Sequence, residues 1–277
     1  MHKPQSISWI VFDIDGVLID VSGSFMKMFY TIVEIYCRRL ELHYHETQVS
    51  DLIHDIKLLP QMNDDWEAGE AILTAYILSF RDNNLQEVLL TQLRSGQSWN
   101  TISPEYGRLL NLDYSLIRHE LMSVYAGDKC PDFYGIPNLF PNREGCYKSE
   151  KPLIKSNYLK KIHHHMLIYT GRNNPELHQA LHLLQIPMEE FAEILDSDSG
   201  FLKPDPTPLM DFYQKYIGKD EIGIFLGDSG ADQKTVDLFN QQIGLKKMLY
   251  ISIGDLNTAG DYHFNSVEEA LRFFSFI

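Results

Sequence analysis

The sequence predicts an α/β protein in which a parallel sheet, covered by helices on both faces, is interrupted near its start by a long helical insertion. Residues 8–14 form a short apolar run that is typical of a buried strand. From Val21 to about Tyr125 the spacing of apolar residues is helical, with little strand pattern. From residue 166 onward, strand-like and helix-like segments alternate, which indicates a parallel sheet.

The composition is that of a folded, acidic protein. The chain has 277 residues, with 24 Lys and Arg against 38 Asp and Glu, and a formal net charge of −14. This length allows one large domain or two. Hydrophobic residues make up 44% and charged residues 22%, which argues against disorder. The acidity argues against a non-specific nucleic-acid binder and against docking on an anionic membrane.

The sequence also predicts the compartment. No apolar run approaches the length of a membrane span, and no secretory leader is recognisable. Three cysteines (Cys37, Cys130 and Cys146) at unpaired spacings predict neither a disulfide framework nor a zinc site. We therefore expect a cytoplasmic protein, either a monomer or a homodimer.

Four helices are predicted in the insertion. Apolar residues recur at three- and four-residue intervals in three stretches, which is the stripe of an amphipathic helix. Ser103 followed by Pro104 predicts the start of a fourth, because the hydroxyl can cap a helix whose first position needs no N–H. The three striped segments are residues 25–40, residues 52–59, which end before Pro60, and residues 85–93.

A stretch rich in Gly, Pro and Asn, residues 127–152, is predicted to be a loop and a domain boundary. Because the first strand has no helix directly after it, it must join the later sheet. We therefore expect one α/β domain from residues 1–20 and 150–277, and an inserted helical domain from residues 21–149. After the boundary, strands are predicted at 166–170, 191–195, 222–226 and 247–253, and helices at 174–184, 208–217 (closed by Gly218), 231–239 and 266–274.

Polar residues of a consistent kind follow the predicted strands. Residues 13–16 (Asp-Ile-Asp-Gly) end the first strand, residues 170–172 (Thr-Gly-Arg) the second, and residues 227–232 (Gly-Asp-Ser-Gly-Ala-Asp) the fourth. Lys203 opens a helix after the weak third strand. Ligands of open parallel sheets bind at the carboxyl ends of the strands, so these residues are expected to meet in one site.

The segments DIDGVLID, LIYTGR, LKPDPTP and FLGDSGAD, in this order, resemble the four motifs of the haloacid dehalogenase (HAD) superfamily of phosphohydrolases. The helical insertion resembles the α-helical cap of the phosphoglycolate phosphatase and β-phosphoglucomutase group. The resemblance implies a Rossmann-like core with an inserted α-helical cap, hydrolysis of a phosphate ester, and magnesium.

The residue types themselves support phosphoryl chemistry. A carboxylate at a strand end can attack phosphorus to form an aspartyl-phosphate, and Asp13 is best placed to do so. Both groups are anionic, so a Mg²⁺ ion held by Asp13 and Asp228 is expected to bring them together. Asp232, four residues later, is expected on the same side as an indirect or water-mediated ligand. The resemblance implies that Asp15 adds its backbone carbonyl to the metal and serves as general acid and base.

Further residues are expected to hold the phosphoryl group. Thr170 is expected to hydrogen-bond a phosphoryl oxygen, and Lys203 to neutralise charge on the nucleophile and the transferring group. Backbone N–H groups at Gly16 and Gly171 are expected to complete the cradle, because glycine lets the backbone approach a phosphate closely. Arg172 has two interpretations: contact with a substrate anion, or a surface salt bridge.

Substrate selection is expected to come from the insertion. Asn63, Asp64, Asp65 and Trp66 form a polar and aromatic cluster able to hydrogen-bond a hydroxylated or amine-bearing substrate and to stack on it. The alternative is a helix start capped by Asp64 or Asp65, with Trp66 anchored in the core.

The predicted function is a Mg²⁺-dependent phosphatase acting on a small phosphorylated metabolite. Asp15 favours this over dehalogenation, because the dehalogenases of the resembled superfamily protonate no leaving oxygen and lack that aspartate. Two alternatives stay open: a phosphomutase on the same scaffold, and a non-catalytic binding protein that keeps the fold.

Overall fold

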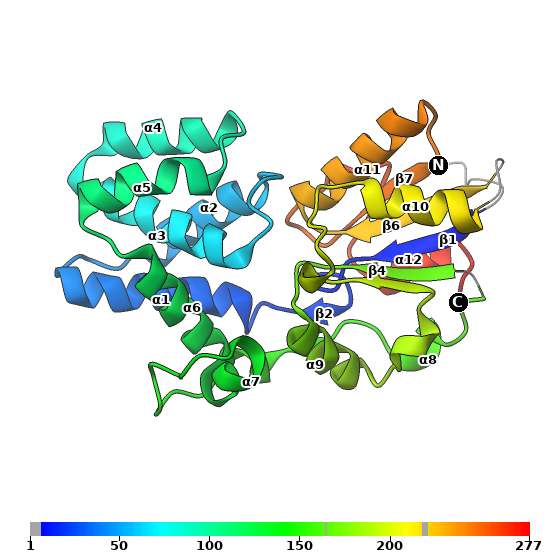
Figure 1. The fold of residues 1–277 in the computed structure, drawn as a ribbon, viewed down its shortest axis with the longest axis horizontal. Helices are drawn as coiled ribbons and strands as arrows, with labels where there is room; N and C mark the ends of the chain where they lie inside the picture. Colours follow the sequence, from blue (N-terminus) through cyan, green and yellow to red (C-terminus); the bar gives the residue numbers. More distant parts are fainter. Residues whose placement is uncertain (1–6, 164, 218–220) are drawn as a thin grey trace. The chain divides into compact units, whose positions relative to one another are not determined.

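The computed structural model describes residues 7–163, 165–217 and 221–277. The chain divides into two compact units (Figure 1). We name Met1–Asp20 together with Lys151–Ile277 the sheet unit, and Val21–Glu150 the helical unit. The helical unit is thus inserted into the sheet unit after its first strand.

The sheet unit contains a six-stranded sheet in which all neighbouring strands are parallel. The order β5-β4-β1-β6-β7-β8 places β1 between β4 and β6, so the chain winds outward from β1 in both directions. This doubly wound arrangement confirms the predicted fold class. The strands are β1 (Ile7–Phe12), β4 (His165–Tyr169), β5 (Glu193–Leu195), β6 (Ile222–Gly227), β7 (Met248–Ile253) and β8 (Tyr262–Phe264).

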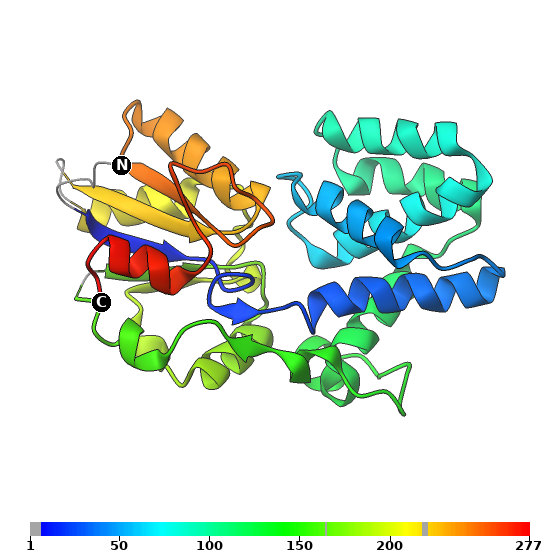
Figure 2. The same ribbon diagram turned by 180° about the vertical axis from the view of Figure 1, so that it is seen from behind.

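Helices cover both faces of this sheet, which buries β1 completely from Trp9 to Phe12. Alternate side chains of a strand point to opposite faces. On one face, the Trp9 ring stacks on Phe212 at 5.6 Å and meets Phe239 edge-on at 5.8 Å. Figures 1 and 2 show α10 and α11 on this face and α9 and α12 on the other. The helices are α8 (Ser156–Leu159), α9 (Asn174–Leu184), α10 (Thr207–Tyr216), α11 (Gly230–Ile243) and α12 (Val267–Phe273).

The predicted strands and helices of this unit match observed elements to within a few residues, but neither the four-residue α8 nor β8 has a predicted counterpart. Strand β8 is absent from the sequence prediction because its three half-buried residues at the sheet edge give no apolar run. The predicted helix stop at Gly218 lies outside the described residues.

A short antiparallel ribbon marks where the chain leaves and re-enters the sheet unit. It pairs β2 (Ile19–Asp20) with β3 (Lys151–Pro152). The Leu153 N–H extends the pairing by donating to the Leu18 carbonyl at 2.8 Å. The two crossings are therefore held side by side, a few residues after the end of β1.

The helical unit is built around α3, which packs against the five other long helices. Residues 68–78 of α3 are all buried, so this helix shows no amphipathic stripe from which it could be predicted. The predicted helices correspond to α1, α2 and α4. The six helices are α1 (Phe25–Leu40), α2 (Glu46–Lys57), α3 (Asp65–Arg81), α4 (Asn83–Arg94), α5 (Trp99–Leu110) and α6 (Tyr114–Ala126).

Two predictions for this unit are wrong. Helix α5 begins at Trp99 rather than after Ser103, and Pro104 lies inside it. Its start is set by the buried Trp99 ring, whose Nε1–H donates to Glu70 at 2.6 Å. Pro104 removes the N–H that would bond the Asn100 carbonyl, at a position where the exposed backbone can bind water instead.

The stretch 127–152 is not a plain loop. It contains α7 (Cys130–Tyr134) and two 3₁₀ turns at Gly127–Lys129 and Cys146–Ser149. Proline and glycine, which suggest a loop in the sequence, here mark the two ends of α7. Pro131 lies in its first turn, and Gly135 ends it in the left-handed conformation.

Candidate active site

The candidate site lies at the carboxyl end of β1, where the direction of winding changes. The Asp13 N–H donates to the Leu226 carbonyl at 3.0 Å, so the backbone keeps its register with β6 up to that residue. Asp228 directly follows β6, and Thr170 directly follows β4. Since β4 and β6 flank β1, these three residues are brought to one edge of the sheet.

Three carboxylates form a cluster at this edge. Asp13, Asp228 and Asp232 each offer an oxygen, and these oxygens lie within 4.8 Å of one another. Asp13 is 5% exposed and Asp232 is fully buried. In the part of the chain that the structure describes, this is the only group of three acidic, His or Cys side chains so arranged.

Lys203 joins two members of the cluster. Its Nζ lies 2.9 Å from Asp13 Oδ1 and 2.7 Å from Asp232 Oδ1, in a side chain that is 1% exposed. Burial alone would lower the pKa of Lys203, but the two carboxylates raise it above its ordinary value, so the group stays cationic. Burial raises the pKa of Asp13, and Lys203 opposes that shift.

Asp232 is positioned by the start of α11. Ser229 is the N-cap, and a capping box links its side chain and backbone to Asp232, with Ser229 Oγ donating to Asp232 Oδ2 at 2.7 Å. Sequence reasoning missed Ser229, although the Ser-x-x-Asp spacing is a recognisable capping signal. Asp232 therefore has one oxygen bound by the cap and the other by Lys203.

Gly16 is required by its surroundings. Its φ is +71°, and a Cβ added there would lie 2.0 Å from Asp228 Oδ2. Its own N–H donates to the Ile19 carbonyl at 2.9 Å. The turn uses this donor, and Gly16 makes room for Asp228. Contact between N–H groups of the Gly16 turn and a phosphate stays a prediction.

Thr170 and Gly171 lie at the end of β4. Thr170 is 1% exposed, and its Oγ1 accepts the Arg172 N–H at 3.2 Å. Gly171 is exposed. Both residues stand beside β1 as the sequence predicts, and their contacts with a phosphoryl group stay predictions.

Arg172 forms a forked ion pair with Asp15. Its Nε and Nη2 lie 2.9 and 2.5 Å from Asp15 Oδ1, and Nε also lies 3.3 Å from Oδ2. The Arg172 side chain is 0% exposed, whereas that of Asp15 is 21% exposed. Arg172 thus forms an ion pair, as one of the two interpretations expected, but with a buried arginine rather than at the surface. Contact with a substrate anion stays a prediction.

The cluster at residues 63–66 belongs to the helical unit, where it forms the capped helix start that was the alternative to a substrate-binding cluster. Asp64 is the N-cap of α3 and accepts the N–H groups of Trp66 and Glu67 at 2.8 and 2.9 Å. Asp65 pairs with Lys57 at 2.7 Å. The Trp66 ring packs against neighbouring aromatic rings of the same unit. A substrate-binding role for Asn63, Asp64, Asp65 and Trp66 stays an untested prediction.

The charge at the sheet edge fits a divalent cation. Four carboxylates and two buried cations lie there. The candidate ligands are all oxygen atoms, the type that Mg²⁺ prefers. The carboxylates are Asp13, Asp15, Asp228 and Asp232, and the cations are Lys203 and Arg172.

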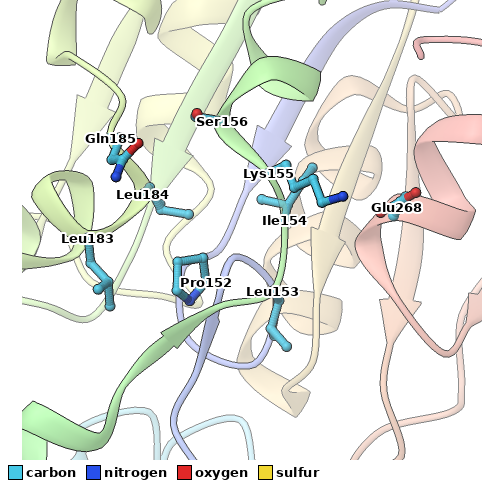
Figure 3. A pocket seen from close by; sticks show the side chains of 9 residues that line it. All are labelled: Pro152, Leu153, Ile154, Lys155, Ser156, Leu183, Leu184, Gln185 and Glu268. Atoms are coloured by element: carbon cyan, nitrogen blue, oxygen red, sulfur yellow. The ribbon is translucent and has the colours of Figure 1, made fainter.

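A surface depression of about 450 Å³ lies elsewhere on the sheet unit (Figure 3). Its lining is mostly aliphatic, and it holds none of the candidate site residues. Glu268, at its edge, pairs with Arg272 at 2.7 Å. It is lined by Pro152, Leu153, Ile154, Lys155, Ser156, Leu183, Leu184, Gln185 and Glu268.

Comparison with solved structures identifies the fold. A phosphatase from Thermococcus thioreducens is similar over 95% of this chain and 99% of its own, with 22% sequence identity and a TM-score of 0.66. A protein proposed to be a phosphoglycolate phosphatase, from Lactobacillus delbrueckii subsp. bulgaricus, is similar over 98% of this chain and 99% of its own, with 12% identity and a TM-score of 0.57. The chain therefore shares the fold of these two proteins.

No protein-family model matches the sequence, and no curated protein is significantly similar to it. Within the described residues, no helix combines the length and apolarity that a membrane crossing requires.

Proposed function

We propose that this chain is a phosphatase that hydrolyses small phosphate monoesters through an aspartyl-phosphate on Asp13. The observation that carries the proposal is the meeting of Asp13, Asp228 and Asp232 with the buried Lys203 at the carboxyl end of β1. The fold shared with phosphatases supports the same reaction class.

The first half-reaction transfers the phosphoryl group to Asp13. A carboxylate oxygen of Asp13 bonds to phosphorus while the ester P–O bond breaks, and Asp15 gives its proton to the leaving alcohol oxygen. Lys203, hydrogen-bonded to Asp13, offsets charge on the nucleophile and the transferring group. Thr170 hydrogen-bonds a phosphoryl oxygen.

The second half-reaction releases phosphate. The Asp15 carboxylate takes a proton from a water molecule, whose oxygen bonds to the phosphorus of the aspartyl-phosphate as the bond to Asp13 breaks. Inorganic phosphate leaves, and both aspartates return to their starting protonation states.

A Mg²⁺ ion would be held by Asp13 and Asp228, with the Asp15 carbonyl as a further ligand and Asp232 acting through water. When bound, it supplies the positive charge that lets an anionic nucleophile approach an anionic phosphate. The carboxylate oxygens of Asp13, Asp228 and Asp232, which lie within 4.8 Å of one another, support this assignment.

The helical unit is proposed to act as a cap that excludes bulk water during the reaction and selects the leaving group. Its insertion point supports this role. Both chain crossings run through the β2–β3 ribbon, a few residues beyond Asp13.

The test is release of inorganic phosphate from a panel of phosphorylated metabolites with Mg²⁺. We expect turnover of at least one member and a loss of about 10³-fold or more in Asp13→Asn. Asp113→Asn, which changes a helix cap in the helical unit, is the matched control and should keep its activity.

Two results would contradict the proposal. Absence of phosphate release from every member would favour a binding protein that keeps the fold. Transfer of the phosphoryl group to another position of the substrate, dependent on a bisphosphate activator and without net phosphate release, would show that the chain is a phosphomutase.

A further inference from the structure

The ion pair between Arg172 and Asp15 stands out because the arginine is entirely buried and the carboxylate is not. Arginine has a planar guanidinium whose fork matches a carboxylate and fixes its orientation, which the point charge of a lysine does not do. Arg172 thus lies behind Asp15, while the 21% exposed carboxylate keeps a face toward solvent.

Arg172 is itself held in place by the segment that follows β4. Its N–H donates to Thr170 Oγ1 at 3.2 Å, and its carbonyl accepts the Ser197 N–H at 2.9 Å. Its Nη1 donates to the carbonyl of Glu176, in the first turn of α9, at 3.4 Å. The backbone segment that places Thr170 therefore also sets the position of the guanidinium.

We propose that Arg172 is a positioning residue that holds the Asp15 carboxylate in the orientation needed for proton transfer at the leaving oxygen. This inference rests on the proposed function. In this proposal, the segment after β4 and the start of α9 hold Arg172, and Arg172 orders the Asp15 carboxylate before a substrate binds.

A double-mutant cycle tests the inference. Arg172→Met should lower kcat for an alkyl phosphate by about 10²-fold, the usual contribution of general acid and base catalysis, with KM nearly unchanged. When Asp15 is already replaced by Asn, adding Arg172→Met should lower kcat hardly any further, because Arg172 acts only by positioning Asp15. Arg172→Lys keeps the positive charge but lacks the planar guanidinium, so its kcat should lie between those of the unmodified chain and Arg172→Met.

p-Nitrophenyl phosphate separates the two half-reactions, because its leaving oxygen needs no proton. With Arg172→Met we expect a burst of nitrophenolate close to one equivalent of enzyme, followed by slow turnover. The burst reports formation of the aspartyl-phosphate, and the slow phase reports the loss of an oriented base for its hydrolysis.

Arg39→Met is the structural control. It removes the arginine partner of another buried carboxylate, Glu120, in the helical unit. We expect it to lower the melting temperature and to leave kcat unchanged. An equal fall in kcat in this control would assign the effect of Arg172→Met to general loss of packing and would overturn the inference.

Other results also overturn it: effects of Arg172→Met and Asp15→Asn that multiply, a change confined to KM, or an unchanged kcat. If Arg172→Met does not fold, the cycle is run with Arg172→Lys, for which the same outcomes decide. Failure of the proposed function is distinct, because it shows as absence of Asp13-dependent phosphate release from the unmodified chain.

Discussion

The two units both bury carboxylates, but they neutralise them in different ways. In the helical unit, Glu70 is 3% exposed and accepts Arg118 Nε at 2.8 Å. Glu120 is 4% exposed and lies 2.6 Å from Arg39. Each buried carboxylate in these pairs has an arginine of its own.

In the sheet unit, by contrast, Asp13 and Asp232 share the single buried Lys203, Asp228 lies in the same cluster, and Arg172 pairs with Asp15. Removing the cation from a buried carboxylate costs several kcal/mol, so a cation shared by two carboxylates matters more than one that serves a single carboxylate. The two units therefore differ in that the carboxylates of these helical-unit pairs each have one arginine, whereas the sheet unit gathers several carboxylates at one edge.

Lys203→Met should have the largest effect. It leaves Asp13 and Asp232 without their shared cation, in a site where both are buried. We expect phosphate release to fall by about 10³-fold or more, since charge stabilisation of phosphoryl transfer is a major contribution. The free energy of unfolding without Mg²⁺, measured by urea denaturation, should fall by about 3–5 kcal/mol.

Arg118→Met makes the corresponding change in the helical unit. Its side chain is 36% exposed, so water can partly replace it, and Trp99 still donates to Glu70. We expect a loss of about 1–3 kcal/mol and no change in phosphate release. Equal losses of stability in the two variants would contradict the contrast between the units.

Mg²⁺ itself should stabilise the sheet unit. A ligand that binds only the folded state at a hundred times its Kd adds about 2.7 kcal/mol to the free energy of unfolding. We therefore expect the melting temperature to rise with Mg²⁺ and to return with a chelator, in calorimetry that resolves the two units. Asp228→Asn should lose most of this rise, and a wild-type chain that melts identically with and without Mg²⁺ would show that no cation completes the site.

The sequence predicts the site better than it predicts the supports of the site. Asp13, Thr170 and Asp228 follow directly from strand-end positions, because the topology of a parallel sheet determines which edge they share. The ion pair of Arg172 with Asp15 joins residues 157 positions apart, and nothing in either local pattern indicates it. Such pairing depends on side-chain direction, which periodicity does not encode.

The errors in the predicted helices also have identifiable physical causes. The wholly buried α3 carries no stripe, and Pro104 inside α5 is tolerated because tertiary packing of Trp99 overrides a local start signal. Gly16 shows the same limit within the site. Its glycine is predictable from the turn, but the Asp228 carboxylate that excludes a Cβ there is visible only in the folded chain.

Gly16→Ala should therefore weaken the proposed Mg²⁺ site without removing any ligand. A methyl group 2.0 Å from Asp228 Oδ2 must displace that carboxylate. We expect Mg²⁺ affinity, measured by titration calorimetry, to fall about 10–100-fold. Gly244→Ala is the matched control, because Gly244 has a φ of +73° but no atom within 4 Å of an added Cβ. An equal loss of affinity in both variants would trace the effect to backbone strain rather than to the clash with Asp228.

The smallest expected effect is the pH dependence that Glu70 gives to the helical unit. Burial raises the pKa of Glu70, while Arg118 and Trp99 lower it, with a net shift upward. As pH rises above the ordinary Glu pKa of about 4.3, the unfolded chain releases this proton before the folded chain does. The folded state then binds more protons than the unfolded state, so the free energy of unfolding falls with rising pH across this interval.

Glu70→Gln carries no titrating proton and should flatten this fall, measured as unfolding free energies from urea denaturation at a series of pH values. Trp99 and Arg118 donate to different oxygens of Glu70, and the single amide oxygen of Gln can replace only one of them, so we expect a loss of stability at every pH in addition to the flatter slope. Phosphate release and its Mg²⁺ dependence should not change, because Glu70 pairs with Arg118 and does not belong to the carboxylate cluster at the end of β1. A shift in Mg²⁺ dependence with Glu70→Gln would mean that the two groups of buried charge are coupled, and the contrast between singly paired carboxylates and clustered ones would have to be abandoned.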